Sequence, residues 1–166
     1  GVWSRCVPDG QPIEPHANFG FPIFADHHFH LGYWVYAAGY LAKHDPQWAE
    51  ARRERLLLLA RDIGNPSPLD AWFPVVRHKD WFLGLSWATG AEGGSRQQES
   101  STEGINAYHG LAALGEALGD PLLQATGQIT LATEIRSVRE YFHVRQHNRA
   151  RFPPYIQEYG AIGMFT

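Results

Sequence analysis

Cysteine is almost absent from this chain of 166 residues, which contains only Cys6. No disulfide can therefore form within the chain. Long apolar runs are also lacking, and runs such as residues 56–60 are far too short to span a membrane. Positive charge is not in excess: 14 Lys and Arg stand against 17 Asp and Glu, for a net charge of −3. The composition therefore gives no reason to expect a membrane or a nucleic acid as a partner.

Apolar and aromatic residues are plentiful. Hydrophobic residues make up 44% of the chain and aromatic residues 13%, including six tryptophans. This length and composition suit one globular domain, residues 1–166, with a real core. Aromatic rings pack well in such a core, but their faces also stack on the apolar faces of sugar rings.

Four helices are predicted from apolar periodicity and from their start signals. Asp45-Pro46 and Asp120-Pro121 each place a capping residue before a first-turn proline. Residues 1–25 carry too many prolines and glycines for a helix and form a loop-rich lead-in. The predicted helices come in two short-linked pairs: 27–43 with 47–63, and 100–118 with 121–144. The expected fold class is therefore all-α, a layered or toroidal array of helical hairpins.

A long segment without clear periodicity, residues 65–98, separates the two pairs. Loops of this length in a compact domain are usually functional or disordered. The segment is rich in aromatic residues, which argues against disorder, so we expect an ordered binding loop. The tryptophans in it are Trp72, Trp81 and Trp87.

Three carboxylates stand where loops meet predicted helices. Asp26 begins a stripe with His30 and Tyr33, because residues three and four apart share a helix face. Glu99 and Glu103 stand at the start of the third helix. Capping offers a plainer role for two of them: Asp26 occupies an N-cap position, and Ser100 with Glu103 has capping-box spacing.

If these junctions meet at one end of a helical array, the carboxylates would share a cleft. Two carboxylates with different pKa values can supply a general acid and a general base. Glycoside hydrolysis needs such a pair, and tryptophan or tyrosine platforms beside it would suit a polysaccharide.

Two other classes of site compete with this interpretation. One is a metal-dependent hydrolase, but no His-x-x-x-His or Cys-x-x-Cys pair supports it, so no metal is expected. The other is a carbohydrate-binding domain without catalysis, which would need the aromatic residues but not the carboxylates. The candidate metal ligands are Asp26, His27, His28, His30 and His78.

Several blocks of the sequence resemble glycoside hydrolase family 81, the endo-β-1,3-glucanases or laminarinases. Residues 26–33 resemble the family's DHHFHYGY signature, and residues 77–90 its next block. Residues 98–108 resemble its QES-x-x-E block, and residues 132–135, 141–144 and 160–164 resemble its following elements. The blocks occur in the family's order and cover most of residues 20–165.

The resemblance implies an inverting, endo-acting hydrolysis of β-1,3-glucan without a cofactor, on an (α/α)6 barrel. By matching, Asp26 would be the general acid, Glu103 the general base, and Glu99 a further essential carboxylate. Inversion requires about 6.5–9.5 Å between the acid and the base. The same blocks supply the expected substrate contacts: His30, Tyr33, His78, Asp80, Trp81, Trp87 and Gln98.

The sequence departs from the family pattern in two places and in length. Leu85 stands where the family usually has histidine, and the Asp-Gly that precedes the family's QES block is replaced around Gly93. A six-hairpin barrel needs about twelve helices of 11–12 residues, so this chain would form part of one. It would be a fragment, a minimal form, or a barrel completed by another copy through self-association. By resemblance, the location is extracellular or at the cell wall.

Overall fold

The computed structural model describes residues 20–90 and 96–163. Within these ranges the chain is helical, and the only extended pairing consists of isolated bridges. The expectation of an all-α fold is therefore confirmed. The α-helices are α1 (His27–His44), α2 (Pro46–Glu50), α3 (Arg53–Gly64), α4 (Ser101–Leu118) and α5 (Pro121–Ser137). The shorter turns are η2 (Phe21–Ile23), η3 (Val138–Phe142) and η4 (Arg149–Arg151).

Most of the predicted helix bounds are confirmed. Asp45 caps α2 by accepting a hydrogen bond from the Trp48 N–H at 2.9 Å, and Asp120 caps α5 in the same way. The prediction of a single helix over residues 47–63 is wrong, because a break at Ala51 and Arg52 separates α2 from α3. In a continuous helix the Arg52 N–H would bond the Trp48 carbonyl. Here that carbonyl accepts from the Arg52 guanidinium, and the Arg52 N–H bonds Ala49 O instead.

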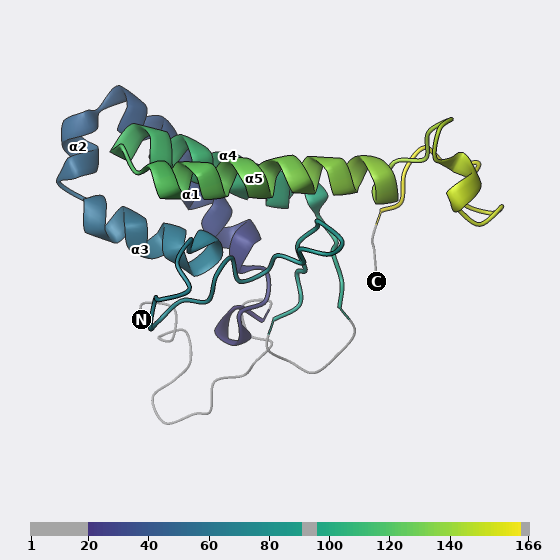
Figure 1. Ribbon diagram of the computed structural model, residues 1–166, viewed down its shortest axis with the longest axis horizontal. Coiled ribbons are helices and arrows are strands. Elements are labelled where there is room, and N and C mark those ends of the chain that lie inside the picture. The colour runs from purple at the N-terminus through teal and green to yellow at the C-terminus, as the bar shows by residue number, and fades with distance from the viewer. Residues whose placement is uncertain (1–19, 91–95, 164–166) are drawn as a thin grey trace.

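Helices α1 and α4 run parallel and very close together, and α5 packs on α4 (Figure 1). A Cβ placed on Gly32 would lie 2.6 Å from Ala107 Cβ, and one on Gly110 would lie 2.7 Å from the Tyr36 backbone. Two glycines therefore permit this approach, which no larger residue would. Because the contacts pair early residues of α1 with early residues of α4, the N-termini of both helices lie at the same end.

The core lies between these helices and α3. It includes Ile63 and Ala60 of α3 and Leu111 and Leu114 of α4, all fully buried. Helix α5 packs antiparallel on α4 after a turn at Gly119 and continues into the π-helical turn η3. The last described segment, yellow in Figure 1, extends beyond the end of α5. No helix in the described part of the chain is both long and apolar enough to cross a membrane.

The long segment that follows α3 is irregular but closely tied to its surroundings. Asn65, which is buried, donates from its side chain to Ser67 O and Phe73 O, at 2.9 and 2.7 Å. A bridge between Lys79 and Ser86 closes a second turn. Residues 1–19, 91–95 and 164–166 lie outside the described residues, and with them Cys6, Gly93 and most of the predicted lead-in.

Candidate active site

Asp26 occupies the first position before α1, but it does not cap the helix. Its backbone is left-handed, with φ 56° and ψ 17°, and its carboxylate makes no capping hydrogen bond. The Asp26 N–H donates to Ala88 O at 2.9 Å, which ties this turn to the long loop. The capping interpretation of Asp26 is therefore wrong, and the carboxylate is left for another role. A left-handed non-glycine residue is an uncommon conformation that often marks a functional site.

The surroundings of Asp26 favour its protonated form. Burial, and then the negative charge of Glu99, raise the pKa of the half-buried Asp26 carboxyl to about 6. Glu103 adds to this effect, while His30 opposes it. Glu99, Glu103 and His30 are therefore close enough to Asp26 for their charges to act on its carboxyl group. A carboxyl with such a pKa can donate a proton near neutral pH.

Glu103 likewise does not serve as a cap. The Ser100 side chain makes no capping hydrogen bond, so the predicted capping box is wrong. The Ser100 N–H instead donates to the Gln98 side chain at 3.1 Å. Glu103 accepts a hydrogen bond of 3.0 Å from the Tyr33 hydroxyl, across the gap between α4 and α1. This bond orients Glu103, and it raises the pKa of the Tyr33 phenol.

Behind these residues lies a buried polar network that the sequence analysis did not identify. The Lys79 ammonium and the Glu134 carboxylate form an ion pair at 2.9 Å, with both side chains fully buried. Ser86 donates to Glu134 from both its N–H and its hydroxyl, and the hydroxyl also bonds Tyr108. Burial lowers the pKa of Lys79, and the Glu134 charge opposes that change. The available signal was a glutamate within one turn of the end of α5, whose other residues are uncharged apart from Arg136.

The histidines have separate environments. His27 bonds Asp62 and Phe21 O, and Asp62 also pairs with Arg77 at 2.8 Å. His28 is fully buried, and His30 is exposed.

Buried His28 stacks on His78 with ring centroids 4.3 Å apart. Among residues 20–90 and 96–163, no group of three His, Cys, Asp or Glu side chains could hold a metal ion.

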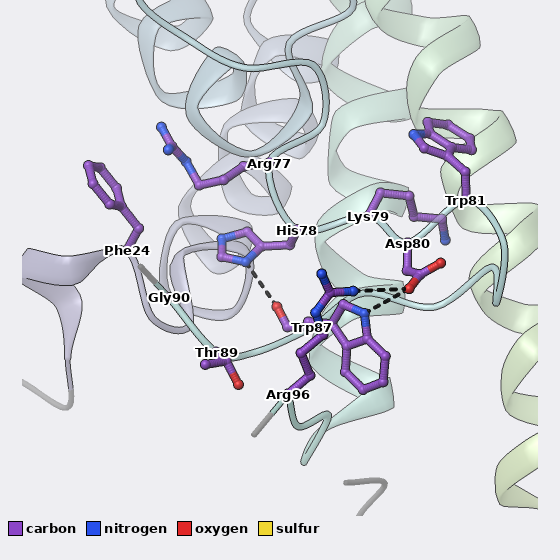
Figure 2. Close-up of a pocket in the computed structure, with 10 residues that line it drawn as sticks. All are labelled: Phe24, Arg77, His78, Lys79, Asp80, Trp81, Trp87, Thr89, Gly90 and Arg96. Atoms are coloured by element: carbon purple, nitrogen blue, oxygen red, sulfur yellow. Dashed lines mark hydrogen bonds and ion pairs between the residues drawn. The ribbon is translucent and has the colours of Figure 1, made fainter. Parts of the chain in front are cut away.

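A cavity of about 680 Å³ opens beside the Asp26 turn (Figure 2). Asp80 orders one wall by accepting hydrogen bonds from the Trp87 indole at 3.0 Å and from the N–H groups of Phe82 and Leu83. Arg96 approaches the same carboxylate at 3.6 Å. The lining residues are Phe24, Arg77, His78, Lys79, Asp80, Trp81, Trp87, Thr89, Gly90 and Arg96.

The expected site residues fall into three sets. Asp26, Glu99, Glu103, His30 and Tyr33 gather where α1 and α4 begin. The second set, His78, Asp80, Trp81 and Trp87, lines the cavity, which none of the three carboxylates lines.

The third set is Gln98 alone, fully buried in the polar network, where it supports the start of α4. Leu85 is fully buried too, and packs with Val138 and Phe142. The difference from the family's histidine at this position is therefore in the interior.

Comparisons with known proteins all indicate the same family. Residues 2–165 match the family described as Glycosyl hydrolase family 81 C-terminal domain. A glucan endo-1,3-beta-D-glucosidase of Arthroderma benhamiae is 34% identical over 151 residues, which are 89% of this chain and 17% of that protein. A primary septum glucan endo-1,3-beta-D-glucosidase of Schizosaccharomyces pombe is 33% identical over 145 residues, 85% of this chain and 14% of that protein.

A solved structure agrees. The glycoside hydrolase family 81 protein CtLam81A from Clostridium thermocellum superposes with a TM-score of 0.78 at 32% identity, covering 94% of this chain and 22% of that one. The chain thus spans a quarter or less of the length of these relatives. It belongs to glycoside hydrolase family 81, as a portion of the family's C-terminal domain.

Proposed function

We propose that this chain carries the catalytic carboxylates of an endo-β-1,3-glucanase that inverts the anomeric centre. The observation that carries the proposal is the half-buried Asp26, freed from capping and held beside Glu99 and Glu103 with a pKa near 6. The names of the relatives supply the substrate class, an internal 1,3-β-glucosidic bond.

In the proposed mechanism, Asp26 protonates the glycosidic oxygen as the bond to the leaving sugar breaks. Glu103, oriented by the Tyr33 hydroxyl, takes a proton from a water molecule that attacks the opposite face of the sugar ring. Glu99 helps to keep Asp26 protonated through its negative charge. No cofactor is needed for these steps.

The cavity beside the Asp26 turn supplies a binding surface for the glucan chain. Trp81 lines the edge of the cavity and is 53% exposed, so its ring can stack on a sugar. Asp80 can accept hydrogen bonds from sugar hydroxyls, and Arg96 can donate hydrogen bonds to them. His30 stands exposed beside the carboxylates. Because the proposed substrate is a polysaccharide, we expect the protein to act outside the cell or at the cell wall.

The test is release of reducing ends from laminarin and curdlan by the parent chain and by Asp26→Asn and Glu103→Gln. Glu116→Gln, an exposed change on α4, is the matched control. We expect activity in the parent and the control and a loss of at least about 100-fold in the other two, as for loss of a general acid or base. The first anomer released, followed by NMR, should be α.

Two outcomes would contradict the proposal. An initial β anomer would refute inversion, and full activity of Asp26→Asn would refute the assignment of the acid. A folded parent chain that binds laminarin oligosaccharides without cleaving them would favour the second candidate, a glucan-binding portion that is not catalytic by itself. The aromatic cavity, which is not lined by Asp26, Glu99 or Glu103, is the feature that favours this candidate.

A further inference from the structure

Glu134 is a fully buried carboxylate that lies outside both the acid–base cluster and the cavity lining. It comes from α5, and its contacts all reach other parts of the chain. Its Oε2 pairs with Lys79 and accepts from the Ser86 hydroxyl at 2.9 Å each. Its Oε1 accepts from the Ser86 N–H at 3.1 Å and faces the Gln98 amide at 3.4 Å. Glu134 therefore joins α5, the long loop and the start of α4.

Gln98 links Glu134 to the segment that carries Glu103, the candidate base. While its Nε2 faces Glu134, the Gln98 Oε1 accepts the Ser100 N–H at 3.1 Å. Gln98 and Ser100 flank Glu99, and Ser100 is the residue before α4, whose first turn contains Glu103. A Cβ on Gly104, the next residue, would lie 3.5 Å from Glu134 Oε1, so this turn packs directly on the carboxylate.

A second series of hydrogen bonds links Glu134 to the segment that carries Asp26, the candidate acid. The Ser86 N–H is bound by Glu134, and two residues later Ala88 lies between both catalytic segments. Ala88 O accepts the Asp26 N–H at 2.9 Å, while the Ala88 N–H donates to Gln97 O at 2.7 Å. The backbone that carries Asp26 and the backbone that leads to Glu99 are thus joined through one residue.

We propose that Glu134 is a positioning residue, which holds the segments of Asp26 and of Glu103 in register through its bonds to Ser86 and Gln98. This proposal rests on the function proposed above. Lys79 neutralises the carboxylate, so that Glu134 can be buried as a hydrogen-bond acceptor. A buried pair of this kind adds little net stability compared with apolar residues of similar size. Its contribution is then to the geometry of the site.

Two double variants separate position from stability. Lys79→Met with Glu134→Gln removes both charges and keeps an acceptor oxygen for Ser86 and Gln98. Lys79→Met with Glu134→Leu removes both charges and the acceptor. Because both variants lose the same lysine contacts, any difference between them reports the acceptor alone.

The first measurement is the titration of Asp26 by NMR of its carboxyl carbon, which requires no catalysis. We expect the Gln variant to keep the parent value, and the Leu variant to return toward the ordinary range as Glu99 and Glu103 move away. The second is hydrolysis of laminarin, where we expect the Leu variant to lose about 10-fold or more in kcat at unchanged KM, as for misplaced catalytic groups.

A folded Leu variant with the parent Asp26 titration would overturn the proposal, whatever the hydrolysis assay shows. If the Leu variant does not fold, Gln98→Met tests the same path, since it leaves the Lys79–Glu134 pair intact. It should shift the Asp26 titration in the same direction, and an unchanged titration would overturn the proposal. Absence of hydrolysis in every variant, parent included, would refute the glucanase function but not the role of Glu134.

Discussion

Lowering the pH from 7 to 4 should destabilise this fold through the stacked pair of His28 and His78. Both rings are buried, and neither His28 nitrogen nor the His78 Nε2 has a hydrogen-bond partner among the described residues. Burial lowers the pKa of His78 to about 4, although its bond to Trp87 O opposes this. Burial and the neighbouring His78 lower the pKa of His28 as well. In the unfolded chain both histidines would titrate near the ordinary value of about 6.5.

The sign of the effect follows from proton binding. At His28 and His78 the unfolded chain binds more protons between pH 6.5 and 4 than the folded one, so the contribution of these two residues to stability falls as the pH falls. Asp26, whose pKa is raised, acts in the opposite direction. For His78 alone, a difference of about 2.5 pKa units corresponds to about 3.4 kcal/mol. About 3 kcal/mol of this is lost by pH 4, where half of the folded His78 is protonated. His28 adds to the loss in the same direction.

Urea unfolding followed by circular dichroism at pH 7, 6, 5 and 4 measures this loss. His78→Asn removes the titrating ring and keeps an N–H for Trp87 O, so its stability should fall by about 3 kcal/mol less than that of the parent. His44→Asn changes an exposed histidine and should follow the parent curve. Parallel curves for the parent and His78→Asn would refute the reasoning.

Two further predictions concern the contact between α1 and α4. Tyr33→Phe removes the hydrogen bond that the exposed Tyr33 side chain donates to Glu103, so the free energy of unfolding should change by under about 0.5 kcal/mol. Laminarin hydrolysis should fall about 10-fold or more. An unchanged rate of hydrolysis would contradict the orienting role of Tyr33. Gly110→Ala forces a Cβ against the Tyr36 backbone and should cost about 1–3 kcal/mol in urea unfolding, whereas Gly104→Ala, which has ordinary contacts, should cost nothing. Equal effects of the two alanines would show that the close approach is not rigid.

The helices were predictable because their signals are local. Apolar periodicity and the Asp-Pro starts depend only on neighbouring residues, and the bounds of α1 and α4 and the start of α5 agree closely with them. The predicted end of the last helix at 144 is wrong, because α5 ends at Ser137 and the π-helical turn η3 continues to Phe142. The break between α2 and α3 was not predictable in this way. It depends on whether the Arg52 side chain or its backbone N–H bonds the Trp48 carbonyl, and the sequence pattern is the same in both cases.

The sequence predicted which residues form the candidate site, but not which residues they contact. Local spacing favoured capping for Asp26 and Glu103, yet neither caps, because tertiary contacts with Ala88 and Tyr33 determine their geometry. Glu134 escaped notice because its partners lie up to 55 residues away along the chain. Gln98 belongs to the QES-x-x-E block, but the sequence does not show that its side chain is buried facing that same distant carboxylate.

The parallel course of α1 and α4 has a consequence for how such a protein can change over evolution. Two adjacent parallel helices cannot be joined by a tight turn, so the chain must travel back along their length, through α3 and the irregular segment that follows. That return path also forms the wall of the cavity. Insertions or deletions within it can therefore reshape the surface proposed to bind the glucan, while the glycine-mediated contact of the two helices keeps Asp26 and Glu103 at a common end. Under the proposed function, glucan binding and catalysis could therefore diversify separately.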